Sequence, residues 1–205
     1  MNNTVKRICR TSILGMALCL MSPALAGAAE MDGFGFYPYM GIGLGGYNLK
    51  YSQPAYSQRN NVFGGYLQLG SDFNDYLGAE LRIGTTAKGS NAYAGGTVDQ
   101  SADYLFSYLL KLQYPTTPDL RLYGLIGGTT GKVKVSPAPA GILSAGTKTA
   151  TGLSYGLGLD YRLADQLRGG LEWVRYWDNI GVNASGVTSS KMTIDGYTAT
   201  LKYLF

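Results

Sequence analysis

Few side chains in this 205-residue chain could serve as a catalytic base, a nucleophile or a metal ligand. The sequence contains no histidine, and its only cysteines are Cys9 and Cys19. Serine and cysteine hydrolases need a base beside the nucleophile, and histidine usually supplies it. Zinc and copper sites also depend mainly on histidine and cysteine. A pair of carboxylates could hydrolyse a glycosidic bond, but no pair in the polar segments is set up for it. We therefore expect no enzyme activity, no metal site and no cofactor.

Both cysteines fall in an N-terminal segment with the features of a secretory signal. Three basic residues precede an apolar run over residues 13–21, and a small-residue Ala-Leu-Ala motif ends at residue 26. We predict a signal peptide over residues 1–26, with cleavage after Ala29 as the alternative, and one mature domain over residues 27–205. Cleavage removes three of 17 basic residues and leaves 14 against 13 acidic ones, a net charge of about +1. This balance does not favour nucleic acid as a partner.

The mature part of the chain alternates between two kinds of side chain with a period of two. Between residues 103 and 114 one side consists only of Tyr, Phe and Leu, while Asp103, Ser107, Lys111 and Gln113 fall on the other. A period of two is typical of a β-strand whose faces meet different surroundings. About ten residues of such alternation, with aromatic ends and a tight turn, form the repeat unit of a membrane β-barrel.

The same pattern recurs along the whole mature chain. We predict eight strands, over residues 37–51, 61–72, 77–88, 103–114, 120–133, 149–163, 167–177 and 191–205. Long loops follow residues 51, 88, 133 and 177, the longest over 134–148, and short turns follow residues 73, 114 and 163. An even strand count with alternating turns and loops indicates an all-β fold, an eight-stranded antiparallel up-and-down transmembrane β-barrel. Both termini then lie at the periplasmic rim.

Alternation also assigns side chains to a lipid-facing side and an inward side. Six lipid-facing aromatics near strand ends are predicted to form a girdle at the membrane interfaces: Tyr104, Tyr114, Tyr155, Tyr161, Trp173 and Trp177. Asp160, Arg162 and Arg168 are expected inside. Arg175 would face outward, where a mid-bilayer arginine destabilises by roughly 2–4 kcal/mol, so we expect a bulge or a rim position there.

Four segments, YMGIGLGGYN, NDYLGAELRIG, KLQYPTTPDLRLYGLIGG and LEWVRYWDNIG, resemble the transmembrane domain of the OmpA family of bacterial outer-membrane proteins. Small stand-alone barrels of the porin-family, OmpX and opacity type are equally similar. The closing YTATLKYLF, with Tyr203 and Phe205, resembles the C-terminal signature that the barrel-insertion machinery recognises. The resemblance implies an integral protein of the bacterial outer membrane, in contact with outer-membrane lipid and lipopolysaccharide. The chain stops at Phe205, so the peptidoglycan-binding domain of long family members is not expected.

The resemblance further implies an ionic core inside the barrel. Glu80, Lys111 and Glu172 fall on the matching motif positions, and Arg82 faces inward by alternation. This core could be a static plug or a gate that opens when ion-pair partners exchange. Two functions follow. The first, which we favour, is a structural or surface-interaction protein whose barrel anchors four extracellular loops that bind an unidentified ligand. The second is a narrow porin-like channel for ions or small solutes.

Overall fold

A computed structural model of the chain describes residues 35–53, 56–93, 96–138, 146–181 and 191–205. The predicted signal peptide, with both of its cleavage positions, lies outside these residues. The described part contains nine strands: β1 Tyr37–Gln53, β2 Tyr56–Asp72, β3 Leu77–Thr86, β4 Gly89–Tyr93, β5 Gly96–Pro115, β6 Leu120–Ala138, β7 Gly146–Ala164, β8 Leu167–Gly181 and β9 Lys191–Leu204. No helix among these residues is long and apolar enough to cross a membrane.

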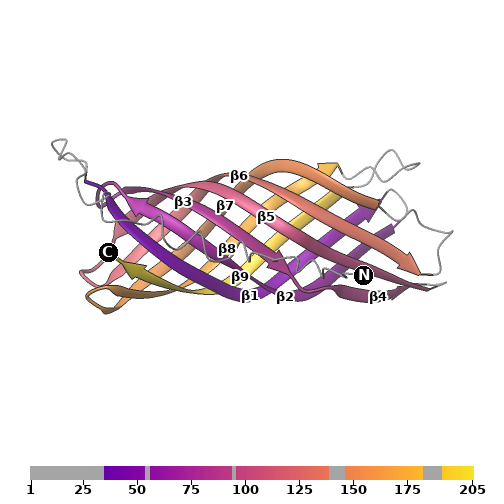
Figure 1. Ribbon diagram of the computed structural model, residues 1–205, viewed down its shortest axis with the longest axis horizontal. Coiled ribbons are helices and arrows are strands. Elements are labelled where there is room, and N and C mark those ends of the chain that lie inside the picture. Colours follow the sequence, from indigo (N-terminus) through magenta and orange to yellow (C-terminus); the bar gives the residue numbers. More distant parts are fainter. Residues whose placement is uncertain (1–34, 54–55, 94–95, 139–145, 182–190) are drawn as a thin grey trace, which may run out of the picture. The chain divides into compact units, whose positions relative to one another are not determined.

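The strands form a closed antiparallel barrel within the unit Phe36–Phe205 (Figure 1). Each strand pairs with its neighbours in sequence, except that β3 pairs directly with β5, and β1 pairs with β9. Eight strands therefore close the barrel in the described part of the chain, and β4 is an additional strand beside β5. The prediction of an all-β, eight-stranded antiparallel barrel is confirmed, and β4 is the one strand that the sequence did not predict.

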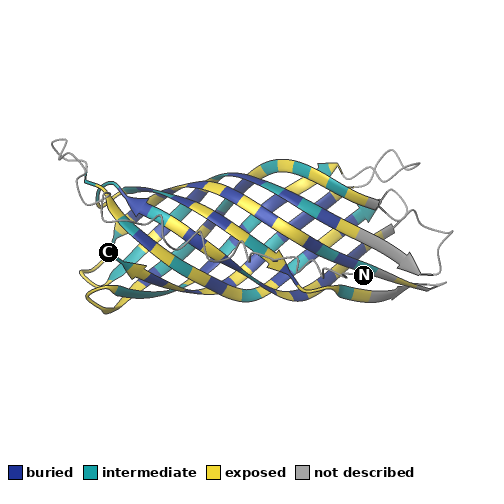
Figure 2. Ribbon diagram, viewed as in Figure 1, coloured by how far each residue is buried: buried dark blue, intermediate teal, exposed yellow. Residues whose placement is uncertain are grey.

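The strands have an inverted distribution of side chains, with apolar residues outside and many polar residues inside. On β5 the alternate residues Phe106, Tyr108 and Leu110 are exposed, whereas Ser107 and Lys111 are buried. Figure 2 shows the same alternation of buried and exposed positions along the barrel strands. An exposed apolar wall of this extent is stable only where lipid replaces water as the surrounding medium. The period-two pattern in the sequence therefore reflects a bilayer around the barrel.

One end of the barrel, which we call the turn end, is closed by the short connections predicted from the sequence. The side-chain oxygen of Asn74 accepts hydrogen bonds from the backbone N–H groups of Tyr76 (2.8 Å) and Leu77 (2.7 Å). The Thr117 hydroxyl accepts one from the Leu120 N–H group at 3.0 Å. Asn and Thr favour turns because their side chains satisfy backbone groups locally. The opposite end is the loop end.

At the loop end the strands are longer than predicted. The predicted loop after residue 88 is a β4–β5 hairpin, in which Ser90 pairs with Asp99. Hydrogen bonds from Lys88, the larger effect, and from Ser90 lower the pKa of the Asp99 carboxyl. Residues 56–60, 134–138 and 146–148 also belong to strands β2, β6 and β7, so the predicted loop 134–148 is mostly wrong. Its middle, residues 139–145, lies outside the described residues.

Two ladders that are not adjacent in the barrel end below the tips of the longer strands. The β2–β3 ladder ends at the pair Gly64 and Thr86, and the β7–β8 ladder ends at the pair Tyr155 and Arg175. Beyond these points the described strands continue as two groups, β8–β9–β1–β2 and β4–β5–β6–β7. The loop end is therefore built from two four-stranded extensions, which come close to each other where Gly89 of β4 lies beside Val62 of β2.

Bulges explain two errors in the predicted faces. The β5–β6 register shifts between Ala102 and Tyr104, so Asp103 is an extra residue that is exposed and not inward as alternation predicts. A second shift follows Arg175 on β8, and Trp177, predicted on the lipid-facing side, is fully buried. A bulge places two successive residues on one face and reverses the pattern beyond it. At the turn end Arg162, predicted inside, is exposed and donates a hydrogen bond to the Pro118 carbonyl.

Candidate functional site in the barrel lumen

The centre of the lumen holds an arginine clamped between two glutamates. Arg82 donates through Nη1 and Nη2 to the two carboxylate oxygens of Glu172, each at 2.7 Å. It also donates through Nε to Glu80 Oε2 at 2.9 Å. Glu80 and Arg82 point the same way because they are two residues apart on β3, and Glu172 reaches them from β8 on the other side of the barrel. All three side chains are almost completely buried, and the bidentate geometry is the strong form of this pair.

Three inward tyrosines complete the environment of the two carboxylates. Tyr39 donates to Glu80 at 2.6 Å, while Tyr66 and Tyr123 donate to Glu172 at 2.9 Å and 3.1 Å. These donors matter because a buried carboxylate is stable only when its remaining lone pairs are satisfied. Sequence reasoning did not identify these tyrosines as partners of the core.

Inward glycines make room for the tyrosine rings. A Cβ atom added at Gly43 would collide with the ring of Tyr66, and one at Gly70 would collide with that of Tyr39. The same holds for Gly158 and Tyr123. A narrow barrel can hold large side chains only where a facing position on the neighbouring strand is empty. This explains the rows of glycine in strands, where glycine is otherwise unfavourable.

A second group of charges lies between this centre and the turn end. Lys202 Nζ is 2.9 Å from Asp160 Oδ2 and 3.6 Å from Glu80 Oε1. Lys111 Nζ is 3.3 Å from Asp72 Oδ1 and 3.6 Å from Asp160 Oδ2. Of the four predicted core residues, Glu80, Arg82 and Glu172 thus meet directly, and Lys111 belongs to this second group. Asp160, which alternation placed inside, and Lys202 are thus further members of the core.

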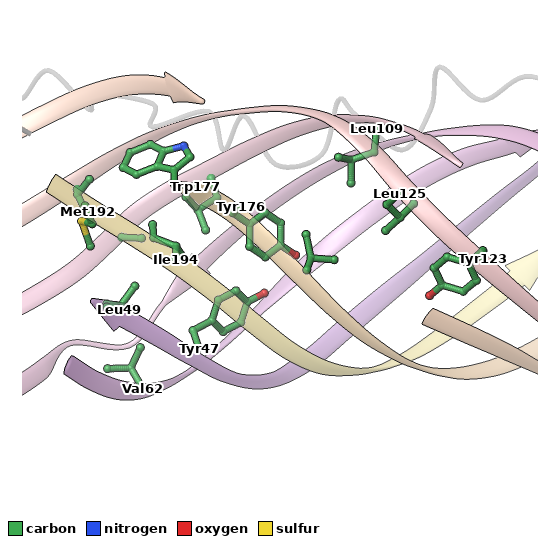
Figure 3. Close-up of a cluster of buried hydrophobic side chains, with 14 residues drawn as sticks. Tyr47, Leu49, Val62, Leu109, Tyr123, Leu125, Tyr176, Trp177, Met192 and Ile194 are labelled. Carbon is green, nitrogen blue, oxygen red and sulfur yellow. The ribbon is translucent and has the colours of Figure 1, made fainter. Parts of the chain in front are cut away.

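The half of the lumen toward the loop end holds a cluster of apolar side chains (Figure 3), together with buried polar ones such as Asn60 and Gln100. Tyr47 and Tyr176 stack with ring centroids 5.9 Å apart, and Met192 and Ile194 are completely buried against them in one cluster. Trp177 on β8 reaches past β7 and donates its indole N–H to the Thr129 carbonyl on β6 at 3.0 Å. Both halves of the lumen are therefore occupied by side chains.

The predicted girdle residues lie as follows. Tyr104, Tyr114 and Tyr161 are exposed on the outer wall, Tyr155 and Trp173 are partly buried in edge-to-face contact, and Trp177 lies inside the lumen. Arg175 faces outward beside Trp173 and binds Asp195 through Nε at 2.7 Å. The charge of Arg175 is thus neutralised on the wall, immediately before the β8 bulge. Tyr203 and Phe205 are exposed and contact each other edge to face.

A closed antiparallel barrel with an apolar outer wall and a charged interior defines an integral β-barrel protein of the bacterial outer membrane. The sequence profile of the outer membrane protein beta-barrel domain matches residues 12–205, and the chain belongs to this family. The resemblance drawn from the four sequence segments is confirmed at this level. No curated protein sequence matches the chain at a significant level.

Two solved structures illustrate the likeness. Neisserial surface protein A is 16% identical, with a TM-score of 0.59, and the alignment covers 82% of this chain and 97% of that one. The attachment invasion locus protein Ail of Yersinia pestis, solved in complex with the heparin analogue sucrose octasulfate, is 18% identical with a TM-score of 0.51. That alignment covers 82% of this chain and 99% of Ail. At these identities the likeness concerns the fold alone.

Proposed function

We propose that this protein is a surface-interaction protein, in which the barrel is an anchor and the loop end carries the binding surface. The observation that supports this most directly is the filled lumen. An ionic network occupies one half, and a cluster containing Trp177, Met192 and Ile194 occupies the other. An eight-stranded barrel is just wide enough for side chains to fill. A filled barrel favours a role for the surface outside the membrane over a role for the interior.

The length of the strands supports the same proposal. β5, β6 and β7 contain 20, 19 and 19 residues. A transmembrane strand needs only about 9–11 residues to cross the bilayer. The remaining length lies at the loop end, which faces the cell exterior in this class of protein, and it continues the barrel as two extensions. Such a raised rim would present the connecting segments well above the lipid surface.

The β4–β5 hairpin offers a direct test. Replacing residues 90–99 by Asn-Gly keeps the Gly89 and Gln100 pair as the base of a two-residue hairpin turn. Ail was solved with a sulfated sugar, so immobilised heparin and whole host cells are reasonable first probes. We expect the shortened variant to lose binding while its unboiled band still migrates as a folded barrel on a gel. A charge-exchange variant, Lys88→Asp with Asp99→Lys, is the matched control. If wild-type protein binds neither probe, or the shortened variant binds as well as wild type, the role of this hairpin is excluded.

The alternative is a narrow channel gated in the lumen, and one observation favours it. The side-chain amide of Gln68, the Thr200 hydroxyl and Asp160 Oδ1 are buried without a hydrogen-bond partner among the described residues. Such atoms usually bind water. Lys202 also lies between Asp160 and Glu80, so a gate could work by moving the Lys202 ion pair from one carboxylate to the other. Planar-bilayer recordings separate the functions. Reproducible conductance steps in wild type that change in Glu80→Gln would support the channel. A wild type that does not conduct, beside a Trp177→Ala variant that does, would support the static plug.

We also propose that the barrel-insertion machinery recognises Tyr203 and Phe205. Both aromatics are exposed at the end of β9, where a partner can reach them. Replacing both by Ala should slow insertion in cells while leaving refolding in detergent nearly unchanged.

A further inference from the structure

Three cations lie on neighbouring strands of the outer wall at the loop end. Lys50 on β1 pairs directly with Arg59 on β2 and with Thr193 on β9. Lys191 pairs with Ser52, so it lies diagonal to Lys50 on the same face. All three cations are exposed. Direct cross-strand neighbours are about 5 Å apart and diagonal ones about 7–8 Å, so the three long side chains can reach a single anion.

Some other cations of the wall are neutralised by a carboxylate. Arg175 is held by Asp195 at 2.7 Å, and Lys88 by Asp99 at 2.5 Å. Lys50 and Lys191 form no ion pair with any described residue. Arg59 has an interaction of its own, so the site uses only its charge and its place in the register.

Below the cations, the same strands present an amide pair and then an aromatic pair. The Asn48 side chain donates to Asn61 Oδ1 at 2.5 Å. Two residues further down, Gly46 pairs with Phe63 on one side and Tyr197 on the other, and both rings are exposed. A Cβ atom at Gly46 would meet no other atom within 4 Å, so the wall is open between the two rings.

Aliphatic grooves follow beneath the aromatic pair. Leu44 borders two hollows in the lipid-facing wall. One is lined by Phe63, Leu67 and Ile83, and the other by Leu157, Leu171 and Tyr197. Four residues of a strand tilted by about 40° separate Gly46 from Lys50, which corresponds to roughly 10 Å along the membrane normal. The order from top to bottom is cation, amide, aromatic ring and aliphatic groove.

We propose that this strip is a binding site for one lipopolysaccharide molecule of the outer leaflet. Its phosphates bind Lys50, Arg59 and Lys191, its sugar lies against the Asn48 and Asn61 amides, and acyl chains fill the two grooves beside Leu44. The order of side chains matches the order of phosphate, sugar and hydrocarbon in this glycolipid, and cations near a membrane surface attract anionic lipid. The site follows from the outer-membrane location and does not depend on the proposed binding of a surface ligand.

The test uses the full barrel refolded in detergent and purified rough-type lipopolysaccharide, with the dissociation constant measured from tryptophan fluorescence. In the variant Lys50→Gln, Arg59→Gln, Lys191→Gln we expect binding to weaken roughly 10- to 100-fold. The charge-retaining variant Lys50→Arg, Arg59→Lys, Lys191→Arg should bind close to wild type. A second control, Lys132→Gln, Lys134→Gln, Lys148→Gln, removes three cations on β6 and β7. It should also bind lipopolysaccharide close to wild type. The difference in migration between boiled and unboiled samples shows that each variant is folded.

Further arms identify the ligand chemistry. Lipopolysaccharide without its phosphates should bind wild type as weakly as intact lipopolysaccharide binds the neutral patch variant. Free tripolyphosphate should bind far more weakly than the lipid, because it cannot use the grooves. Equal binding by wild type and the neutral patch variant would overturn the site. Equal losses in the two glutamine variants would show a general charge effect and would also overturn it. Tripolyphosphate that binds as tightly as lipopolysaccharide would overturn the choice of a lipid ligand.

Discussion

The two halves of the lumen solve the same packing problem with different chemistry. Toward the turn end, inward positions carry charges such as Arg82, Lys111 and Lys202, each buried and each facing carboxylates. Toward the loop end, inward positions carry side chains such as Trp177 and Ile194, and none of the buried charges in the described part of the chain lies there. The barrel wall separates both halves from lipid. The two halves therefore contain different side chains because their roles differ. The surrounding bilayer alone does not determine which side chains line the lumen.

The difference has consequences for stability. A charged lumen depends on geometry, because each ion must keep its partners once it has been taken out of water. An apolar lumen depends on volume, because its free energy follows the area buried and the cavities left. We therefore expect the ionic half to be intolerant of losing one member and tolerant of neutralising the whole set. The apolar half should respond in proportion to the volume removed.

The largest expected effect comes from Arg82→Met. This change leaves Glu80 and Glu172 facing each other in the lumen without the guanidinium that binds both. Removing one partner of a buried ion pair typically costs about 3–5 kcal/mol. The free energy of unfolding should be measured by urea denaturation in lipid vesicles.

The matched control is the variant Glu80→Gln, Arg82→Met, Glu172→Gln, which removes all three charges. It should recover most of the stability, because amides can still accept hydrogen bonds from Tyr39 and Tyr66. If the neutral variant is as unstable as Arg82→Met alone, packing volume and not charge balance governs this half as well, and the contrast between the halves fails.

A smaller effect is expected from Ile194→Ala in the apolar half. Ile194 is completely buried, and truncation of such a residue costs about 2–4 kcal/mol through lost burial and the remaining cavity. Leu201→Ala, on the lipid-facing side of the same strand, is the control and should cost less, because lipid can fill the space. The two should be compared by the temperature at which the folded band is lost on a gel. If both variants lower this temperature equally, the apolar cluster is no better packed than the interface with lipid.

The sequence predicted the membrane-spanning part of the barrel well. There the two faces meet lipid and lumen, and this contrast produces alternation that a reader of the sequence can follow, as in Phe106, Ser107 and Tyr108. Above the bilayer the contrast disappears, because both the outer face and the rim meet water. Strand β4 and the upper ends of β6 and β7 therefore looked like loops in the sequence, although backbone pairing holds them in the sheet.

The partners within the lumen were harder to predict than the face on which each residue lies. Arg82 and Glu172 are 90 positions apart, and only the stagger of the strands decides that they meet. The same stagger assigns Lys111 to Asp72 and not to Glu80. Register across a closed barrel depends on all strands together, and a local pattern does not contain it. Bulges also change faces: the outward charge of Arg175 indicated the one before Trp177, whereas the one at Asp103 had no such cue.

The smallest expected effect tests whether such a bulge is needed to place the apolar half. Asp103 is the extra residue between Ala102, which is fully buried, and Tyr104, which is exposed. Deleting Asp103 leaves these two residues adjacent on opposite faces, so the alternation becomes regular and every neighbour keeps its side. We expect a change of no more than about 1 kcal/mol in the free energy of unfolding. Deletion of Ser107, four residues along the same strand, is the control. It must turn one part of β5 over and bring lipid-facing aromatics such as Phe106 into the lumen. The Ser107 deletion should therefore give no heat-modifiable band, whereas the Asp103 deletion should refold like wild type. Loss of the folded band in both deletions would show that the bulge itself positions the loop-end extension on which the apolar half depends.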